Sequence, residues 1–158
     1  MTRSILLIEQ DTTRAAQFQS AVATRTLRVT VAPGIDEALL MITTSPPDVI
    51  VVSPPPKEKT PRDAKADRPP PQGIATVKRL RSVERFPGPI LVLTDSMARD
   101  DQLDFYKAGA DDLCPRWSGL AYTIERLSFW FENTTNSLKA FERRKAAIDA
   151  LLDPKPRS

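Results

Sequence analysis

The chain has no histidine and a single cysteine, Cys114, among its 158 residues. These absences exclude metal sites of the His/Cys type, catalysis by histidine and a disulfide within the chain. No apolar run approaches the ~20 residues that a membrane-spanning helix needs. The apolar run near the N-terminus is too short for a signal peptide, and no small-residue cleavage site follows it. We therefore expect a soluble cytoplasmic protein of single-domain size, without membrane insertion.

Short apolar runs alternate with helical patterns along most of the chain. Five runs rich in branched residues predict buried strands over 4–9, 27–32, 48–53, 89–94 and, more weakly, 110–114. Helical patterns follow a possible N-cap at Asp11 and occupy 36–43, 74–83, 100–107 and the segment from Gly119 onward. Strands that alternate with helices favour a parallel sheet with both faces covered. The predicted fold class is therefore α/β with a five-stranded parallel sheet.

The positive charge is concentrated in one proline-rich segment. Between Lys57 and Arg85 there are nine Lys/Arg and four Asp/Glu, a local net charge of +5, whereas the whole chain carries +3. Nine of the fifteen prolines lie between positions 54 and 89. A segment so poor in large apolar groups has no core of its own, and we expect it to order when it binds a partner. Its charge favours an anionic partner.

The C-terminal segment is longer than the predicted sheet needs. Apolar residues from Leu120 to Leu152 follow a heptad-like spacing and predict one long helix from Gly119, whose second half projects from the domain. The projecting half would carry an apolar stripe that needs a partner helix or a groove. Its members are Leu138, Phe141, Ile148 and Leu152. We therefore predict a domain over 1–132 and a helical extension with a tail over 133–158.

Four motifs, in order and at suitable spacing, resemble the CheY-like receiver domain over residues 3–130. ILLIEQD is similar to the acidic turn after the first receiver strand, and PDVIVVS to the third strand, which ends in the phosphorylated aspartate. ILVLTD is similar to the fourth strand with its switch threonine, and AGADDLCPR to the family's AGADDYL-x-K run. The resemblance implies the receiver (flavodoxin-like) fold, with an insert over 54–72 after the third strand and an extended C-terminal helix.

The residues that perform phosphotransfer in receivers are mostly replaced. A receiver uses an acceptor aspartate, two acidic groups that hold Mg²⁺, and a hydroxyl and a lysine that bind the product. The acceptor position here is Ser53, and the acidic pair is Glu9 and Gln10. Thr94 keeps the hydroxyl, and Arg116 stands in place of the lysine. Without a base, an acidic nucleophile or a metal cage, we expect a degenerate site without metal or catalytic residues, and neither a transferase nor a phosphatase.

The insert lies next to this degenerate site, because Ser53 and Gly73 are twenty residues apart, further than in ordinary receivers. A receiver with an arginine-rich insert here resembles the CheY-like cyclic di-GMP effectors of the Cle group. That resemblance implies a pseudo-receiver whose insert binds cyclic di-GMP and needs no further cofactor. It also implies a protein partner, the flagellar motor switch at the flagellated pole, through which the protein modulates motility and surface attachment.

The residue types of this region suit a cyclic dinucleotide. Guanine O6 and N7 accept a bidentate arginine, and a guanidinium also stacks on a base. A carboxylate can accept from the guanine N–H groups. The predicted ligand-binding residues are Arg62, Asp67, Arg68 and Gln72 of the insert, and Lys78, Arg79, Arg81 and Arg85 of the following helix, in which the i,i+4 spacing puts Arg81 and Arg85 on one face.

A second hypothesis is a phosphorylation-independent interaction module that uses the basic segment on another anionic partner, either an acidic protein surface or a nucleic acid. Nucleic acid is the less favoured of these two. No aromatic residue between Lys57 and Arg85 could stack on bases, and no helix-turn-helix pattern follows the receiver-like region.

Overall fold

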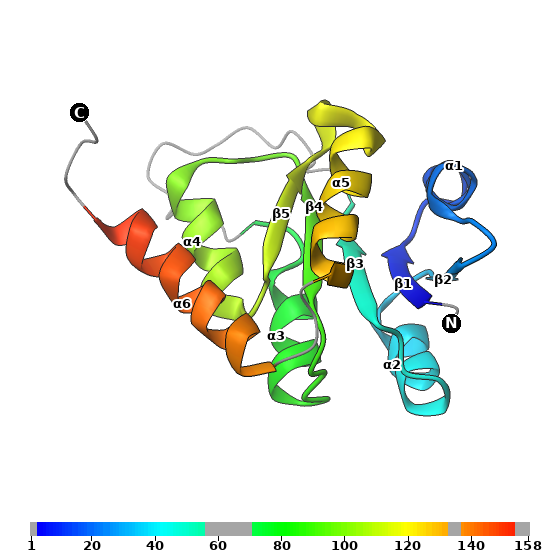
Figure 1. Ribbon diagram of the computed structural model, residues 1–158, viewed down its shortest axis with the longest axis horizontal. Coiled ribbons are helices and arrows are strands. Elements are labelled where there is room, and N and C mark those ends of the chain that lie inside the picture. The colour runs from blue at the N-terminus through cyan, green and yellow to red at the C-terminus, as the bar shows by residue number, and fades with distance from the viewer. Residues whose placement is uncertain (1–2, 56–70, 133–136, 154–158) are drawn as a thin grey trace, which may run out of the picture.

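The computed structural model describes residues 3–55, 71–132 and 137–153, without the side chains of 137–141. The strands are β1 (Arg3–Glu9), β2 (Leu27–Ala32), β3 (Val49–Ser53), β4 (Ile90–Thr94) and β5 (Asp112–Pro115). The helices are α1 (Thr12–Val22), α2 (Ile35–Thr44), α3 (Ile74–Ser82), α4 (Arg99–Ala108), the 3₁₀ turn η1 (Arg116–Ser118), α5 (Gly119–Glu132) and α6 (Ser137–Leu152). Figure 1 shows how they alternate along the chain.

All strand pairs are parallel, and the sheet order is β2-β1-β3-β4-β5. The predicted α/β class with a five-stranded parallel sheet is therefore confirmed. Two register pairs at the carboxyl ends of the strands are Glu9 with Ser53 and Thr94 with Pro115. This edge is where ligands bind in open α/β sheets, because the loops that follow the strands meet there.

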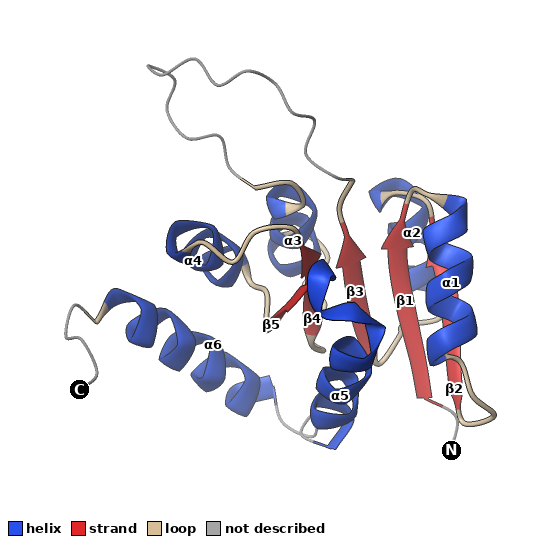
Figure 2. Cartoon of the chain, turned by 90° about the horizontal axis from the view of Figure 1, so that it is seen from above, coloured by secondary structure: helices blue, strands red, loops and turns tan. Residues whose placement is uncertain are grey.

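Helices cover both faces of the sheet, so the strands are buried on both sides (Figure 2). Successive strand residues point to opposite faces. One face packs against α1 and α5, where Phe18, Leu127 and Trp130 lie. The other packs against α2, α3 and α4, where Leu80 and Phe105 lie. This arrangement explains why β3 and β4 read as continuous apolar runs, with every residue of both strands buried.

The start of α1 follows the sequence prediction. Asp11 is its N-cap, and its side chain accepts a hydrogen bond from the backbone N–H of Arg14 at 2.8 Å. Phe18 and Val22 are buried against the sheet, whereas Ala21 is exposed.

The prediction of one continuous C-terminal helix is wrong. Helix α5 ends at Glu132, and α6 lies against α4 instead of projecting (Figure 2). Arg144 of α6 donates to the Asp111 carboxylate at 2.6 Å, and Arg99 of α4 donates to the carbonyl of Leu151 at 2.6 Å. The break lets α6 fold back and cover α4, which a straight helix could not do.

Only part of the predicted apolar stripe can be placed. Ile148 is half-buried and Leu152 is 49% exposed, while the side chains of Leu138 and Phe141 lie outside the described residues. Within the described ranges, none of the helices has the length and apolar character needed to cross a bilayer.

Candidate functional site

The residues that the sequence assigned to a degenerate phosphorylation site lie at the carboxyl edge of the sheet. The Ser53 hydroxyl at the end of β3 donates to Glu9 Oε1 at the end of β1 over 2.8 Å. Both side chains are buried. Arg116, just after β5, donates from Nη1 to Ser53 Oγ at 3.2 Å. The structure therefore brings together three of the residues that the sequence assigned to this site, and joins them through the serine hydroxyl.

Arg14, which the sequence analysis did not single out, provides the positive charge next to Glu9. Its Nε donates to Glu9 Oε1 at 2.8 Å, and its Nη2 lies 3.4 Å from Oε2. This hydrogen bond raises the pKa of Arg14. The backbone N–H of Asp11 donates to Oε2 at 3.2 Å. The signal that could have found Arg14 is its place in the first turn of the helix that follows the acidic turn.

The resemblance to receiver domains implies Mg²⁺ at this edge, but the residues present do not fit it. Mg²⁺ requires an octahedral set of oxygen ligands, including carboxylates. The Glu9 carboxylate already accepts from Arg14, Ser53 and the Asp11 N–H, and Gln10 is exposed. Across residues 3–55, 71–132 and 137–153, there is no group of three or more His, Cys, Asp or Glu that could hold a metal.

Thr94 is buried at the end of β4 but bonds to its own loop. Its hydroxyl donates to the carbonyl of Ser96 at 2.9 Å and accepts from the Ser96 N–H at 3.1 Å. These bonds close a local turn, the usual role of a threonine at a strand end. In this conformation the hydroxyl stabilises the loop after β4.

Arg116 connects the buried Ser53 to the root of the insert, by which we mean its two described ends, residues 54–55 and 71–72. Its Nη2 donates to the carbonyl of Pro54, and its Nε lies 3.2 Å from the Asp95 carboxylate. Burial lowers the pKa of Arg116, and the charge of Asp95 opposes this effect. A single guanidinium thus contacts Ser53, the first residue of the insert and the loop after β4.

The two ends of the insert meet at this root. Pro71 is buried, and Gly73 adopts φ = 97°, which favours glycine. A Cβ on Gly73 would lie 2.7 Å from Pro54 Cγ, so only a residue without a side chain allows this contact. A small cavity of about 30 Å³ is lined by residues from both ends, including Pro55 and Gln72.

A second cavity, of about 200 Å³, opens above Ser53 between α1 and α5. Its lining includes Glu9, Arg14, Arg116 and Leu120. Pockets that enclose a drug-sized ligand occupy ~300–1,000 Å³. The cavity above Ser53 is therefore too small to enclose a cyclic dinucleotide. Such a ligand would have to bind at the surface.

The predicted ligand-binding residues fall into three groups. Arg62, Asp67 and Arg68 lie outside the described residues. Gln72, Lys78, Arg79 and Arg85 are exposed. Arg79 lies 3.7 Å from Asp36, a pair in which both side chains are largely solvated. Exposed pairs of this kind contribute ~0–1 kcal/mol, so Arg79 can exchange this partner for another.

Arg81 is the third group, and its guanidinium is bound within the protein. Its Nε donates to the carbonyl of Gly109 at 2.7 Å, and its Nη1 donates to the carbonyls of Phe86 and Gly88, each at 2.7 Å. Its Nη2 donates to the Asp111 carboxylate. Burial lowers the pKa of Arg81 to about 10. With its guanidinium nitrogens bonded to the protein, Arg81 is not part of the ligand surface that we propose.

The expected shared face of Arg81 and Arg85 is also absent. Helix α3 ends at Ser82, and Arg85 lies beyond it with φ = 52°. Because Arg85 is outside the helix, the i,i+4 relation does not apply to this pair. Arg85 is exposed, whereas only 14% of the Arg81 side chain is accessible.

Comparisons with known proteins identify the fold. No family model matches the chain, and no curated protein matches it. Among solved structures, the receiver domain of the Francisella response regulator 1452 is 22% identical, covering 84% of this chain and 98% of its own, with a TM-score of 0.67. Vibrio cholerae chemotaxis protein CheY4 is 17% identical over 82% of this chain and 99% of its own, with a TM-score of 0.65. A two-component response regulator from Clostridium difficile is 17% identical over 85% and 100%, with a TM-score of 0.67.

These likenesses establish one conclusion. The chain has the fold of CheY-like response-regulator receiver domains. The sequence identities of 17–22% are too low to transfer a function from these proteins.

Proposed function

We propose that this protein is a cyclic di-GMP-binding adaptor of the CheY-like type, whose output does not depend on phosphorylation. One observation carries the proposal. The acceptor position is a serine bonded to Glu9 and Arg116, and Arg116 also holds Pro54 at the root of the basic insert. The group that would sense phosphate in a receiver is thus attached to the segment with the concentrated positive charge.

The chemistry of the insert supports this ligand. Cyclic di-GMP presents two phosphates and two guanines, and arginine can pair with both kinds of group. Arg62 and Arg68 are the insert residues that we propose for this contact, with Asp67 accepting from a guanine edge. Lys78 and Arg79 are exposed on α3, which follows the insert directly. They are placed to add to the positive field around the ligand.

The proposed output is an interaction with a protein partner. The resemblance to the Cle group points to the flagellar motor switch, and to an effect on motility and surface attachment. A ligand held by the insert would be connected to the domain body through the Pro54–Arg116–Ser53 contacts. This connection gives ligand binding a physical path to the carboxyl edge of the sheet.

Calorimetry on the full chain tests ligand binding. We expect cyclic di-GMP to bind and GTP and a single-stranded oligonucleotide to bind far more weakly. The double variant Arg62→Ala/Arg68→Ala should lose about 30-fold or more in affinity, since each bidentate base contact contributes ~1–3 kcal/mol. The matched control is Arg25→Ala/Arg28→Ala, which removes the same charge from two exposed arginines, one just before β2 and one within it.

The outcomes separate the two hypotheses for the basic segment. Equal losses in both double variants would indicate diffuse charge attraction, and oligonucleotide binding as tight as that of cyclic di-GMP would favour the nucleic-acid alternative. No binding of cyclic di-GMP would overturn the proposal. The output is tested by co-purification of flagellar motor switch proteins with the full chain, which should increase when cyclic di-GMP is present.

A further inference from the structure

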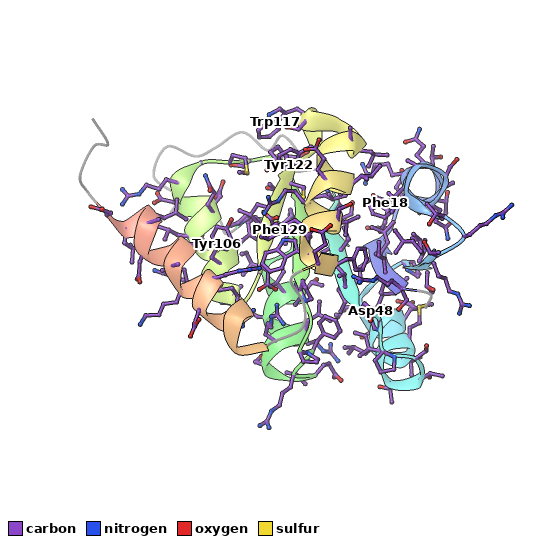
Figure 3. All side chains as sticks on the ribbon, in the orientation of Figure 1. Phe18, Asp48, Tyr106, Trp117, Tyr122 and Phe129 are labelled. Carbon is purple, nitrogen blue, oxygen red and sulfur yellow. The ribbon has the colours of Figure 1, made fainter. Side chains whose placement is uncertain are left out.

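Trp117 presents a large aromatic surface to solvent. It lies in η1 and is 64% exposed, whereas Trp130 is 3% exposed and donates its indole N–H to Asp112 at 2.9 Å. Figure 3 shows Trp117 at one end of the molecule, beyond the tip of α5. An isolated exposed apolar residue needs no explanation by itself. The position of Trp117 relative to the insert is what makes it informative.

Trp117 directly follows the residue that holds the root of the insert. The Arg116 guanidinium donates to the carbonyl of Pro54. The small cavity beside Arg116 is lined by Pro55 and Pro71, the described residues on either side of the undescribed part of the insert. The chain therefore leaves and re-enters the domain next to the turn that carries the indole.

The turn that carries Trp117 is fixed at both ends. Pro115 before it is buried and in register with Thr94 of β4, and Gly119 after it takes φ = 78° to begin α5. The side chain of Arg116 donates hydrogen bonds to Ser53 and to the carbonyl of Pro54. The backbone is thus set by the sheet and by α5, and a surface held in this way loses little conformational entropy on binding.

We propose that Trp117 is a stacking platform for a guanine of the cyclic dinucleotide, an inference that rests on the proposed function. The basic segment has no aromatic residue of its own between Lys57 and Arg85. The indole supplies what the segment lacks, a flat apolar surface for one face of the base. An arginine can cover the opposite face, because guanidinium groups stack on aromatic planes.

Fluorescence and calorimetry on the full chain test this inference with cyclic di-GMP as the probe. Stacking on Trp117 should quench the emission of the exposed indole, while the buried Trp130 gives an unchanged internal reference. Trp117→Ala should weaken binding by about 5- to 150-fold, the range for loss of one base–aromatic stack. Trp117→Phe should restore most of the affinity. Leu40→Ala, which truncates a side chain that is 72% exposed on α2, is the control and should bind like the wild type.

The outcomes distinguish this inference from the proposed function. If the wild type binds cyclic di-GMP but Trp117→Ala binds equally well, the stacking role is wrong and the proposed function stands. If Trp117→Phe binds as poorly as Trp117→Ala while both melt like the wild type, the site recognises a feature of indole other than its aromatic face, and the stacking role is again wrong. No binding by the wild type overturns both.

Discussion

Two arginines, Arg81 and Arg116, each join distant parts of the chain, but their carboxylate partners differ in exposure. Arg81 pairs with Asp111, whose side chain is fully buried and also accepts from the Ile90 N–H at 2.8 Å. Arg116 pairs with Asp95, whose side chain is 46% exposed. A buried charge that loses its partner is strongly destabilising, whereas a solvated one is not. An arginine whose carboxylate partner is buried therefore stabilises the fold. An arginine whose carboxylate partner is exposed can leave that ion pair at little cost.

The two clusters also differ in what they connect. Burial raises the pKa of Asp111, against the opposing charges of Arg81 and Arg144. Arg81 comes from α3 and Arg144 from α6, so one carboxylate fixes two helices beside β5. The cluster around Ser53 instead connects strand ends to the insert. The first cluster holds helices on the sheet, and the second connects the sheet to the start of the insert.

The largest expected effect is on folding. Arg81→Ala should lower the free energy of unfolding by ~3–5 kcal/mol, since it leaves the buried Asp111 with less compensation and three backbone carbonyls without a donor. Urea unfolding measures this loss. Arg79→Ala is the control from the same helix, and its exposed pair with Asp36 predicts a loss below ~1 kcal/mol. Equal losses would contradict the distinction between buried and solvated partners.

The second prediction concerns α6. Arg144→Ala should lower the free energy of unfolding by ~1.5–3 kcal/mol, because it removes one hydrogen bond to a charged, buried group while Arg81 remains. Hydrogen exchange of the α6 backbone should become faster, since this bond connects α6 to Asp111. Lys145→Ala, an exposed neighbour on α6, provides the comparison. Unchanged exchange in α6 would show that its contact with α4 is sufficient to hold the helix.

The third prediction concerns the serine. Ser53→Ala removes the donor to Glu9 and the acceptor for Arg116, but Glu9 keeps its bond to Arg14. We expect a loss of ~0.5–1.5 kcal/mol in the free energy of unfolding, as for an ordinary hydrogen bond. A thermal melt together with urea unfolding gives the value. A loss as large as that of Arg81→Ala would mean that the serine holds the fold as strongly as the buried arginine does.

The last prediction is that the mass of the protein does not change on treatment with a phosphoryl donor. Acetyl phosphate with Mg²⁺ should not label the protein, because the acceptor is a serine and Glu9 is occupied by Arg14. Intact-mass measurement before and after incubation checks this, with a receiver domain that has the complete acidic site as the positive control. A stable phosphoryl adduct on Ser53 would disprove the pseudo-receiver interpretation.

The strands could be predicted from sequence because their signal is local. The run 48–53 contains β3, and 89–94 contains β4, since branched apolar residues in short runs are typical of buried parallel strands. The position of Ser53 was also accessible, because it follows from a motif whose order along the chain is fixed. Local patterns thus predicted the sheet and the place of Ser53 at the end of β3.

The role of Arg81 could not be predicted in this way. Its partners Gly109 and Asp111 are 28 and 30 residues away, so no local pattern links them. The helical spacing of Arg81 suggested a ligand face, but long-range bonds determine where its side chain goes. The division of the C-terminal segment into α5 and α6 was missed for a similar reason. The apolar spacing is interrupted at Thr134 but resumes at Leu138, so it favoured one helix. The packing of α6 on α4 is a tertiary effect that the spacing does not report.

The close approach of Pro54 and Gly73 means that the segment between them could be replaced by another one. Its two ends are held together by the domain, through Arg116 on one side and the left-handed glycine on the other. The entropy of closing a loop grows slowly with length, by ~0.6 kcal/mol for each doubling. Segments of other lengths could therefore be grafted between these ends without changing the sheet.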